Sequence, residues 1–314
     1  MKTRSWFLLG ALGACATSNP RLAAEASHAH HRLAVASLEP RRMVNVLGTS
    51  LAVHDSAPDS DKPTIVCMHA IGHGGSDFAS FERTFADRYR IVTIDWPGQG
   101  ASLRDREPAS AQRYTTLLTA VIEALSLRNV ILFGNSIGGS CAVRYAAQVP
   151  SNVRALILAN SAGFDESPGG FLPGLFIGHI EKKMARGAAG DPAFQAWFRD
   201  WYADVLVTPA ARLQRDAIVA SAYEIAPVLR EAWSSFKRAD ADVRALAAKL
   251  SMPVFVGWAE QDRIIRWSRS RAAIERIPHV EVHLFPAAHA AFLETPDDFA
   301  EAAENFLLRL DTPR

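Results

Sequence analysis

A serine in the middle of the chain stands in a setting that suits nucleophilic chemistry. Ser136 lies in Gly134-Asn135-Ser136-Ile137-Gly138-Gly139, directly after the apolar stretch Val130–Phe133 and before a helix-like pattern. On a sharp turn between a strand and a helix, a serine hydroxyl points clear of the sheet, and flanking glycines avoid clashes there. Backbone N–H groups at the start of the helix can hold an oxyanion. The pattern predicts that Ser136 is a nucleophile.

A serine nucleophile needs a base, and the base needs an acid that orients it. His289 follows the last predicted strand, and Asp262 follows the strand before it. Parallel strands end at one edge of a sheet, so we expect Ser136, Asp262 and His289 to meet there. Asp165, after an earlier strand, is an alternative acid, although an aspartate there can also cap a helix. The neighbouring Arg263 favours Asp262, because a cation helps to keep a carboxylate ionised.

The chain from Met43 onward alternates strand-like and helix-like stretches, and residues 44–53 suggest a hairpin folded at Gly48. Short apolar runs predict strands at 64–69, 89–95, 129–134, 153–159, 253–257 and 280–285. Helical spacing predicts helices at 78–86, 113–125, 138–149, 268–277 and 296–310. This alternation predicts an α/β fold: a mostly parallel, doubly wound sheet with helices on both faces.

One interval of about 90 residues, which we bound as 162–250, contains no convincing strand. It is rich in aromatic residues at helical spacing. These rings predict a helical cap with a small core of its own, in which a few rings line an apolar pocket over the sheet edge. The Pro- and Gly-rich residues 168–174 predict a flexible connection to it. The cap divides the α/β core into two parts, 43–161 and 251–314.

The N-terminal residues are set apart from the fold by their composition. Residues 1–16 begin with positive charge and continue with small apolar residues, as an export signal does. Ala14-Cys15-Ala16 offers a cleavage site, while residues 12–15 resemble the bacterial lipoprotein box, in which Cys15 carries the lipid. Lipidation and simple cleavage both stay open. We expect an exported protein, periplasmic or lipid-anchored in a bacterial envelope, with a cytoplasmic one as the alternative.

A linker, 17–42, follows the predicted signal. It contains His28, His30 and His31, which we interpret as part of a solvated tether and not as a metal site, because they have no acidic or cysteine partners.

The composition excludes several classes of protein. Among 314 residues, 34 Lys and Arg balance 33 Asp and Glu, so a nucleic-acid partner is not expected. The sequence contains no run of roughly 18 uninterrupted apolar residues, so a polytopic membrane protein is not expected. Three cysteines are too few for a disulfide scaffold, and Cys67 and Cys141 are expected to be buried thiols. The expected partner is a small-molecule substrate, and the sequence carries no signal for an oligomeric state.

Three motifs together make the chain from Met43 to Leu310 resemble the α/β-hydrolase family. Residues 69–75 (HAIGHGG) resemble its oxyanion loop, with Ala70 where Gly is usual. Residues 95–102 (DWPGQGAS) are similar to its D-x-P-G-x-G-x-S turn. Residues 289–296 (HAAFLETP) resemble its H-x-x-x-x-E-x-P ending, although an alanine replaces the usual Gly before the histidine. The resemblance implies a nucleophile elbow and a Ser-Asp-His triad on an α/β-hydrolase fold.

The resemblance also implies that the backbone N–H groups of Ile71 and Ile137 form the oxyanion hole. The nucleophile then sorts the family's reactions: haloalkane dehalogenases and epoxide hydrolases use an aspartate, so Ser136 argues against both. Proline iminopeptidases usually carry H-G-G-P-G at the oxyanion loop, which residues 69–73 do not match.

Two reactions remain in order of preference. The first is hydrolysis of a carboxylic ester of a small to medium apolar substrate through an acyl-enzyme on Ser136, with acyl transfer as a variant. The second is C–C bond hydrolysis of the meta-cleavage type. Such hydrolases often share Gly-Asn-Ser-x-Gly-Gly, which includes Asn135, but they commonly have Trp where this chain has Ala290. A non-enzymatic ligand-binding module on the same fold is the alternative from another class. Neither a metal nor an organic cofactor is implied, because this chemistry needs none.

Overall fold

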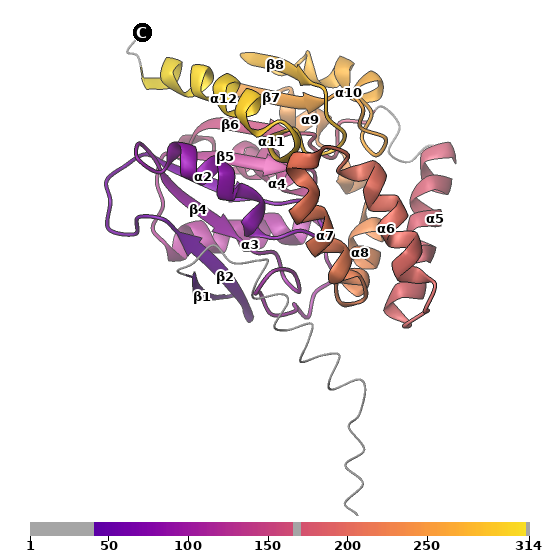
Figure 1. Ribbon diagram of the computed structural model, residues 1–314. Helices are drawn as coiled ribbons and strands as arrows, with labels where there is room; N and C mark the ends of the chain where they lie inside the picture. The colour runs from indigo at the N-terminus through magenta and orange to yellow at the C-terminus, as the bar shows by residue number, and fades with distance from the viewer. Residues whose placement is uncertain (1–40, 166–170, 312–314) are drawn as a thin grey trace, which may run out of the picture.

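A computed structural model describes residues 41–165 and 171–311, and its centre is one eight-stranded sheet in the order β1-β2-β4-β3-β5-β6-β7-β8 (Figure 1). The strands are β1 (Arg41–Val46), β2 (Thr49–Asp55), β3 (Thr64–Met68), β4 (Arg90–Ile94), β5 (Val130–Asn135), β6 (Val153–Ala159), β7 (Val254–Ala259) and β8 (Val280–Phe285). The first two strands pair antiparallel, and β3 to β8 run parallel. The α/β fold class is therefore confirmed.

The central strands are buried along their whole length, because helices cover both faces of the sheet. Every residue of β3, β5 and β7 is buried, which explains why these strands read as continuous apolar runs. The core helices are α2 (Ala79–Phe85), α3 (Ala111–Ala124), α4 (Ile137–Gln148), α10 (Trp267–Ile274), α11 (Ala291–Glu294) and α12 (Pro296–Asp311). Helix α3 packs beside α4, whereas α2 packs against α12 (Figure 1).

The first two strands form the expected hairpin. Leu47 and Gly48 both have positive φ values, 50° and 77°, as a tight two-residue hairpin turn requires. Strand β1 begins at Arg41, so the last two residues of the predicted linker belong to the sheet. Arg42 belongs to the sheet because it pairs with Val53 of β2, and its guanidinium lies 3.5 Å from Asp55 on the same strand.

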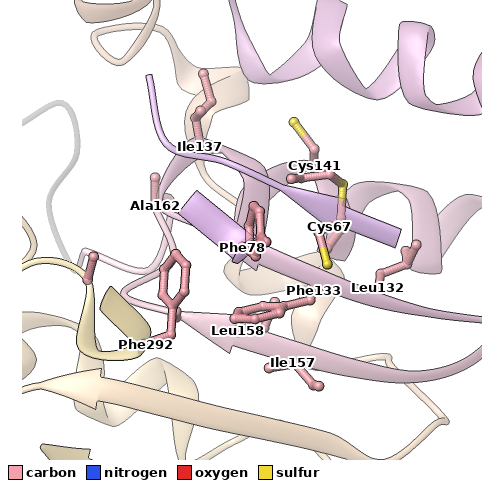
Figure 2. Packing of buried hydrophobic residues seen from close by; sticks show 14 of the residues in the cluster. Cys67, Phe78, Leu132, Phe133, Ile137, Cys141, Ile157, Leu158, Ala162 and Phe292 are labelled. Carbon is pink, nitrogen blue, oxygen red and sulfur yellow. The ribbon is translucent and has the colours of Figure 1, made fainter. Parts of the chain in front are cut away.

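Aromatic rings fill the core beneath the end of β5. Phe133, on β5, is 5.0 Å from Phe78 and 5.2 Å from Phe292 between ring centroids, and the last two rings are stacked (Figure 2). Such packing holds β5 and the turn that follows it rigidly. Cys67 and Cys141 are free buried thiols, as expected. Burial raises the pKa of Cys141 to about 12 and that of Cys67 well above its usual range, so neither is a reactive thiolate.

The described residues between β6 and β7 form helices and no strand. They are α5 (Phe171–Ala188), α6 (Phe194–Val205), α7 (Arg212–Ala220), α8 (Ala222–Ser235) and the short α9 (Arg244–Ala247). Helices α5 to α8 lie together at one side of the sheet (Figure 1). Helix α9 packs against α4 and α10 instead, so the end of the interval belongs structurally with the core and not with the cap.

The expectation of a flexible connection at 168–174 is wrong for its second half. Residues 171–174 form the first turn of α5, where Pro173 is tolerated because the first turn needs no N–H donor from it. Residues 166–170 lie outside the described residues.

The predicted signal, Cys15, the histidine cluster and nearly all of the linker also lie outside the described residues. Within the ranges that are described, no helix has both the length and the apolar character needed to cross a bilayer.

Candidate active site

Ser136 sits on a strained turn between β5 and α4. Its φ of 53° and ψ of −117° are unfavourable for any residue with a side chain, and such strain persists only where the surroundings enforce it. Here the backbone N–H of Ser136 donates to the carbonyl of Ala159 at 3.1 Å, and its own carbonyl accepts from the N–H of Ala162 at 2.9 Å. The turn is thereby tied to the end of β6, and it leaves Ser136 lining a cavity.

The glycines around Ser136 are required by close approach of the backbone. A Cβ added to Gly134 would lie 2.4 Å from the carbonyl carbon of Gly138. A Cβ added to Gly138 would lie 2.2 Å from the carbonyl oxygen of Met68, on β3. Neither neighbour is a flexible side chain, so a larger residue at these positions would push α4 away from the sheet.

The structure brings His289 and Asp262 together at the ends of β8 and β7. Asp262 Oδ2 lies 2.8 Å from His289 Nδ1, and both residues are buried. Asp262 Oδ1 accepts from the backbone N–H groups of Ile264 and Ile265 at 2.7 and 2.9 Å. Asn160 donates from Nδ2 to Asp262 Oδ2 at 2.7 Å. These contacts fix the carboxylate in the plane that faces the imidazole.

Two neighbours of this pair differ from the sequence expectation. Arg263 turns away from Asp262 and pairs with Asp204, on α6, at 3.0 Å, with 71% of its side chain exposed. No ion pair joins Arg263 to Asp262 within the described residues, and hydrogen-bond donors surround the carboxylate instead. Asp165, the alternative acid, is 2.7 Å from Arg269.

The pKa of His289 lies above its ordinary value. Burial alone would lower it, but the charge of Asp262 and the hydrogen bond to the ring outweigh burial, and Glu294 adds to them. With Nδ1–H donated to Asp262, the neutral ring presents Nε2 as an acceptor, as a general base must.

Glu294 is a residue whose role the sequence pattern does not show. It is buried, and its Oε1 accepts from the backbone N–H groups of Ala288 and His289, both at 3.0 Å. Its Oε2 accepts from the N–H of Val207 at 2.7 Å, just after the cap helix α6. One carboxylate thus holds the loop that carries His289 and joins that loop to the cap. The only signal in the sequence is the H-x-x-x-x-E spacing.

Two backbone amides near Ser136 are free to hold an oxyanion. The N–H groups of Ile71 and Ile137 form no hydrogen bond in the described part of the chain, whereas the next amide, that of Gly72, donates to Gln99. The loop is set by His69, whose Nδ1–H donates to the carbonyl of Ala70 at 2.6 Å and whose Nε2 accepts from the N–H of Trp96 at 2.9 Å. Burial lowers the pKa of His69 to about 4, so this histidine is neutral and structural.

A cavity of about 380 Å³ lies over Ser136 and His289, and cap side chains form much of its wall. Its aromatic lining comes from Phe176, Trp201, Tyr202, Trp233 and Phe236. Other cap rings do not line the cavity and pack behind those that do: Phe194 is 5.3 Å from Phe198 between centroids, and Phe198 is 4.8 Å from Tyr202. Part of the aromatic content is thus cap core, and part faces the cavity. Residues 41–165 and 171–311 contain no group of three or more His, Cys, Asp and Glu placed to hold a metal ion.

The comparison with family models identifies this architecture. Residues 63–296 match the model described as the alpha/beta hydrolase fold, which is most of the chain. The chain belongs to this family.

Among curated proteins, the chain is 27% identical over 281 residues to a 2-hydroxy-6-oxononadienedioate/2-hydroxy-6-oxononatrienedioate hydrolase of Paraburkholderia phymatum, which covers 85% of this chain and 95% of the relative. It is 23% identical to 3-oxoadipate enol-lactonase 2 of Acinetobacter baylyi, over 80% of this chain and 91% of that protein.

Solved structures show the same fold. The enol-lactonase of Burkholderia xenovorans superposes with a TM-score of 0.71 at 18% identity, covering 85% of this chain and all of its own. A thermophilic esterase of Thermogutta terrifontis gives 0.72 at 19% identity, covering 87% and 99%.

Proposed function

We propose that this hydrolase attacks a carbonyl carbon with the hydroxyl of Ser136. Nε2 of His289 takes the hydroxyl proton, Asp262 holds the imidazole in the required tautomer, and the N–H groups of Ile71 and Ile137 stabilise the oxyanion. The 2.8 Å contact between Asp262 and His289 and the shared cavity of His289 and Ser136 support these roles. The protonated His289 then gives its proton to the leaving group.

We further propose that the scissile bond is a carbon–carbon bond next to a ketone in an acidic dienoic substrate. The sequence alone ranks this reaction second, after ester hydrolysis, and the comparison with curated proteins favours it over the ester reaction. The similarity to the 2-hydroxy-6-oxononadienedioate hydrolases, over 85% of this chain, is the observation that carries the proposal. Water is added across the bond: the acyl half becomes a carboxylic acid, and the carbon leaving group takes a proton.

The charge at the cavity supports an acidic substrate. Arg263, Arg266 and Arg269 all line it. Arg263 and Arg269 are paired with aspartates at 3.0 and 2.7 Å, whereas Arg266 has no ion pair within the described residues. An exposed guanidinium at the cavity is well suited to a carboxylate, which it can bind through two parallel hydrogen bonds.

Hydrolysis of an ester or enol-lactone is the second candidate, and Ala290 favours it. The C–C hydrolases that the sequence resembles commonly have Trp after the histidine, and this chain has a fully buried alanine there. A ring-shaped lactone and an open-chain acid differ in the shape that the cavity must accept, so activity separates the two.

A substrate panel tests the choice between these reactions. Purified protein would be assayed on 2-hydroxy-6-oxonona-2,4-dienedioate, on 3-oxoadipate enol-lactone and on p-nitrophenyl butyrate. We expect kcat/KM to be highest on the dienedioate. A higher value on the lactone or on the neutral ester would overturn C–C hydrolysis and leave ester chemistry as the function.

Substitution of one arginine tests the proposed carboxylate site. Arg266→Leu should raise KM for the dienedioate about tenfold and leave KM for p-nitrophenyl butyrate nearly unchanged, because only the acid loses an ionic contact. Arg271→Leu is the matched control: Arg266 directly precedes α10 and Arg271 lies on that helix, where it pairs with Glu275 at 2.6 Å and does not line the cavity. Equal effects of both variants on the acid would refute the assignment.

We also propose that the N-terminal residues export the chain, with lipidation at Cys15. The charged and then apolar pattern of residues 1–16 supports this. A fatty-acid analogue fed to expressing cells should label the wild type and not Cys15→Ser. Processed but unlabelled protein would mean simple cleavage, and unprocessed cytoplasmic protein would refute export.

A further inference from the structure

Two further polar side chains, neither of them part of the Asp262–His289 pair, lie in the wall of the cavity. His73 belongs to the loop after β3, two residues beyond Ile71, and Tyr202 belongs to the cap helix α6. Both line the cavity that contains Ser136 and His289, and their ring centroids are 5.9 Å apart. Only 4% of His73 and 2% of Tyr202 is exposed. One comes from the core and the other from the cap.

The orientation of His73 is fixed on one side. Its Nδ1 lies 2.7 Å from Asp77 Oδ2, and Asp77 is itself almost fully buried. Asp77 also accepts a hydrogen bond from Gln214, on the cap helix α7, and Gln214 Nε2 is 3.2 Å from Ser76 Oγ. Asp77 and Gln214 therefore act as positioning residues. Because Gln214 belongs to the cap, the orientation of the His73 ring depends on where the cap packs.

The remaining polar atoms of the pair have no hydrogen-bond partner among the described residues. Neither Nε2 of His73 nor the hydroxyl of Tyr202 forms a hydrogen bond within residues 41–165 and 171–311. Buried polar groups are nearly always hydrogen-bonded, because an unpaired one costs free energy. Neither atom is sealed off by the protein, and both residues line the cavity, so a polar group of a ligand in the cavity can complete them.

The hydrogen-bonding capacity of the pair defines that ligand. In its neutral form, with Nδ1–H donated to Asp77, the imidazole offers Nε2 as an acceptor, and the tyrosine hydroxyl can donate. An acceptor and a donor on neighbouring rings, with centroids 5.9 Å apart, match a hydroxyl group, which donates a hydrogen bond to the imidazole and accepts one from the tyrosine. We propose that His73 and Tyr202 form a subsite for a hydroxyl of the substrate, an enol or an alcohol.

The subsite deepens the proposed function, because it adds recognition of a substrate hydroxyl to the attack by Ser136. The other aromatic residues that line the cavity, Phe176, Trp201, Trp233 and Phe236, are phenylalanines and tryptophans with largely apolar rings. Such a surface accepts an acyl chain with or without a hydroxyl, so discrimination between the two must come from polar groups of this kind.

A matched pair of acids tests the subsite. The probes are 2-hydroxy-6-oxonona-2,4-dienedioate and the same acid without the 2-hydroxyl, each used as a competitive inhibitor of p-nitrophenyl butyrate hydrolysis. For an acid that the enzyme cleaves, the inhibition constant equals its KM, so affinity is also measured by calorimetry on Ser136→Ala, which cannot turn the acid over. The wild type should bind the hydroxylated acid about 10- to 100-fold more tightly, and Tyr202→Phe and His73→Phe should each remove most of that ratio.

Controls separate this role from a structural one. Tyr202→Phe keeps the packed ring, so it remains informative even if His73→Phe fails to fold. His73→Gln retains an acceptor and should restore part of the ratio. His54→Phe is the matched control, because His54 is also a buried histidine paired with a carboxylate, Glu82 at 3.0 Å, yet it lies outside the cavity; its ratio should equal that of the wild type.

The outcomes distinguish this proposal from the proposed function. If Tyr202→Phe and His73→Phe change binding of both acids equally, or leave the ratio unchanged, the hydroxyl subsite is wrong, whatever the reaction. If the ratio falls as expected but the dienedioate is never cleaved, the subsite stands and the C–C reaction fails. If Ser136→Ala still hydrolyses p-nitrophenyl butyrate, the nucleophile itself is wrong.

Discussion

The cavity has two parts that are held in place in different ways. One is its floor, the loops at the strand ends that carry Ser136, Asp262 and His289; the other is the wall formed by the cap helices. On the floor, hydrogen bonds hold Asp262 and His289: two backbone amides and the side chain of Asn160 fix Asp262, and the carboxylate of Glu294 fixes the loop of His289. In the cap, rings from separate helices pack on one another, as Trp201 does on Trp233 with centroids 6.0 Å apart.

This difference has a physical consequence. Strand ends in a packed sheet move little, so they can position reacting groups, whereas ring packing accommodates changes of shape at a modest cost. The floor is therefore expected to set the reaction and the cap to set the choice of substrate. Substitutions on either side of the cavity can break or sharpen this division.

The largest effect is expected on the floor at Ser136. Ser136→Ala should lower kcat by about five to six orders of magnitude, as loss of the nucleophile does in serine hydrolases. The smaller side chain fits the strained turn, so the midpoint of thermal unfolding should change little. Activity on p-nitrophenyl butyrate close to that of the wild type would contradict the assignment.

The next largest effect distinguishes the two candidate acids. Asp262→Asn should lower kcat about 10⁴-fold, because the tautomer of His289 is no longer fixed. Asp165→Asn, which breaks only the 2.7 Å ion pair with Arg269, should be mild. Both variants would be measured on one ester. A crippled Asp165→Asn beside a mild Asp262→Asn would reverse the assignment.

The pH profile follows from the raised pKa of His289. The base must be neutral, so kcat/KM should fall about tenfold per pH unit below that pKa and level off above it. This pKa lies above the ordinary histidine value of about 6.5. As the pH is lowered, kcat/KM should therefore begin to fall at a higher pH than it would with an unperturbed histidine; this falling part of the profile is its acid limb. Asp262→Asn removes the main cause of the upward shift and should move the limb to lower pH. A limb that stays in place would mean that another group titrates.

A smaller effect is expected where the floor meets the cap, at Glu294. Glu294→Gln replaces one accepting oxygen by an NH₂ group that faces backbone N–H donors, so the free energy of unfolding should fall by about 2 kcal/mol. The shifted loop should also lower kcat about 10- to 100-fold. Denaturant titration and ester kinetics measure the two effects.

The control for Glu294 is Glu304→Gln, at an exposed ion pair with Arg88 of 2.7 Å. It should change stability by under about 1 kcal/mol. If both variants change the free energy of unfolding equally, Glu294 contributes no more to stability than an exposed ion pair does.

The smallest effect is expected in the cap. Trp201 lines the cavity, and its stacked neighbour Trp197, 5.5 Å away, does not. Trp201→Leu should favour longer acyl chains by about fivefold to tenfold in kcat/KM over a series of p-nitrophenyl esters. Trp197→Leu should lower stability without moving that preference. If both variants lower all esters equally, the rings are only cap core, and the division between floor and cap fails.

Much of the fold follows from local patterns in the sequence. Strand and helix positions are found within a few residues, because burial of a parallel sheet requires continuous apolar runs and a covering helix requires its own spacing. The elbow at Ser136 is equally local, since a strained turn between strand and helix demands glycines within two residues of it. The order of Ser136, Asp262 and His289 along the strands then predicted their meeting place.

The tertiary structure decided the contacts between distant residues. Asn160 reaches Asp262 from the end of β6, Glu294 reaches Val207 beside the cap, and Arg263 pairs with Asp204. No spacing encodes these three partners, because they depend on how β6 and the cap helices pack against the loops after β7 and β8. His73 and Asp77 are only four residues apart in the chain, but the place of this pair beside Tyr202 in the cavity depends on the packing of the cap. Local sequence thus determined which groups can react, and long-range packing determined what surrounds them.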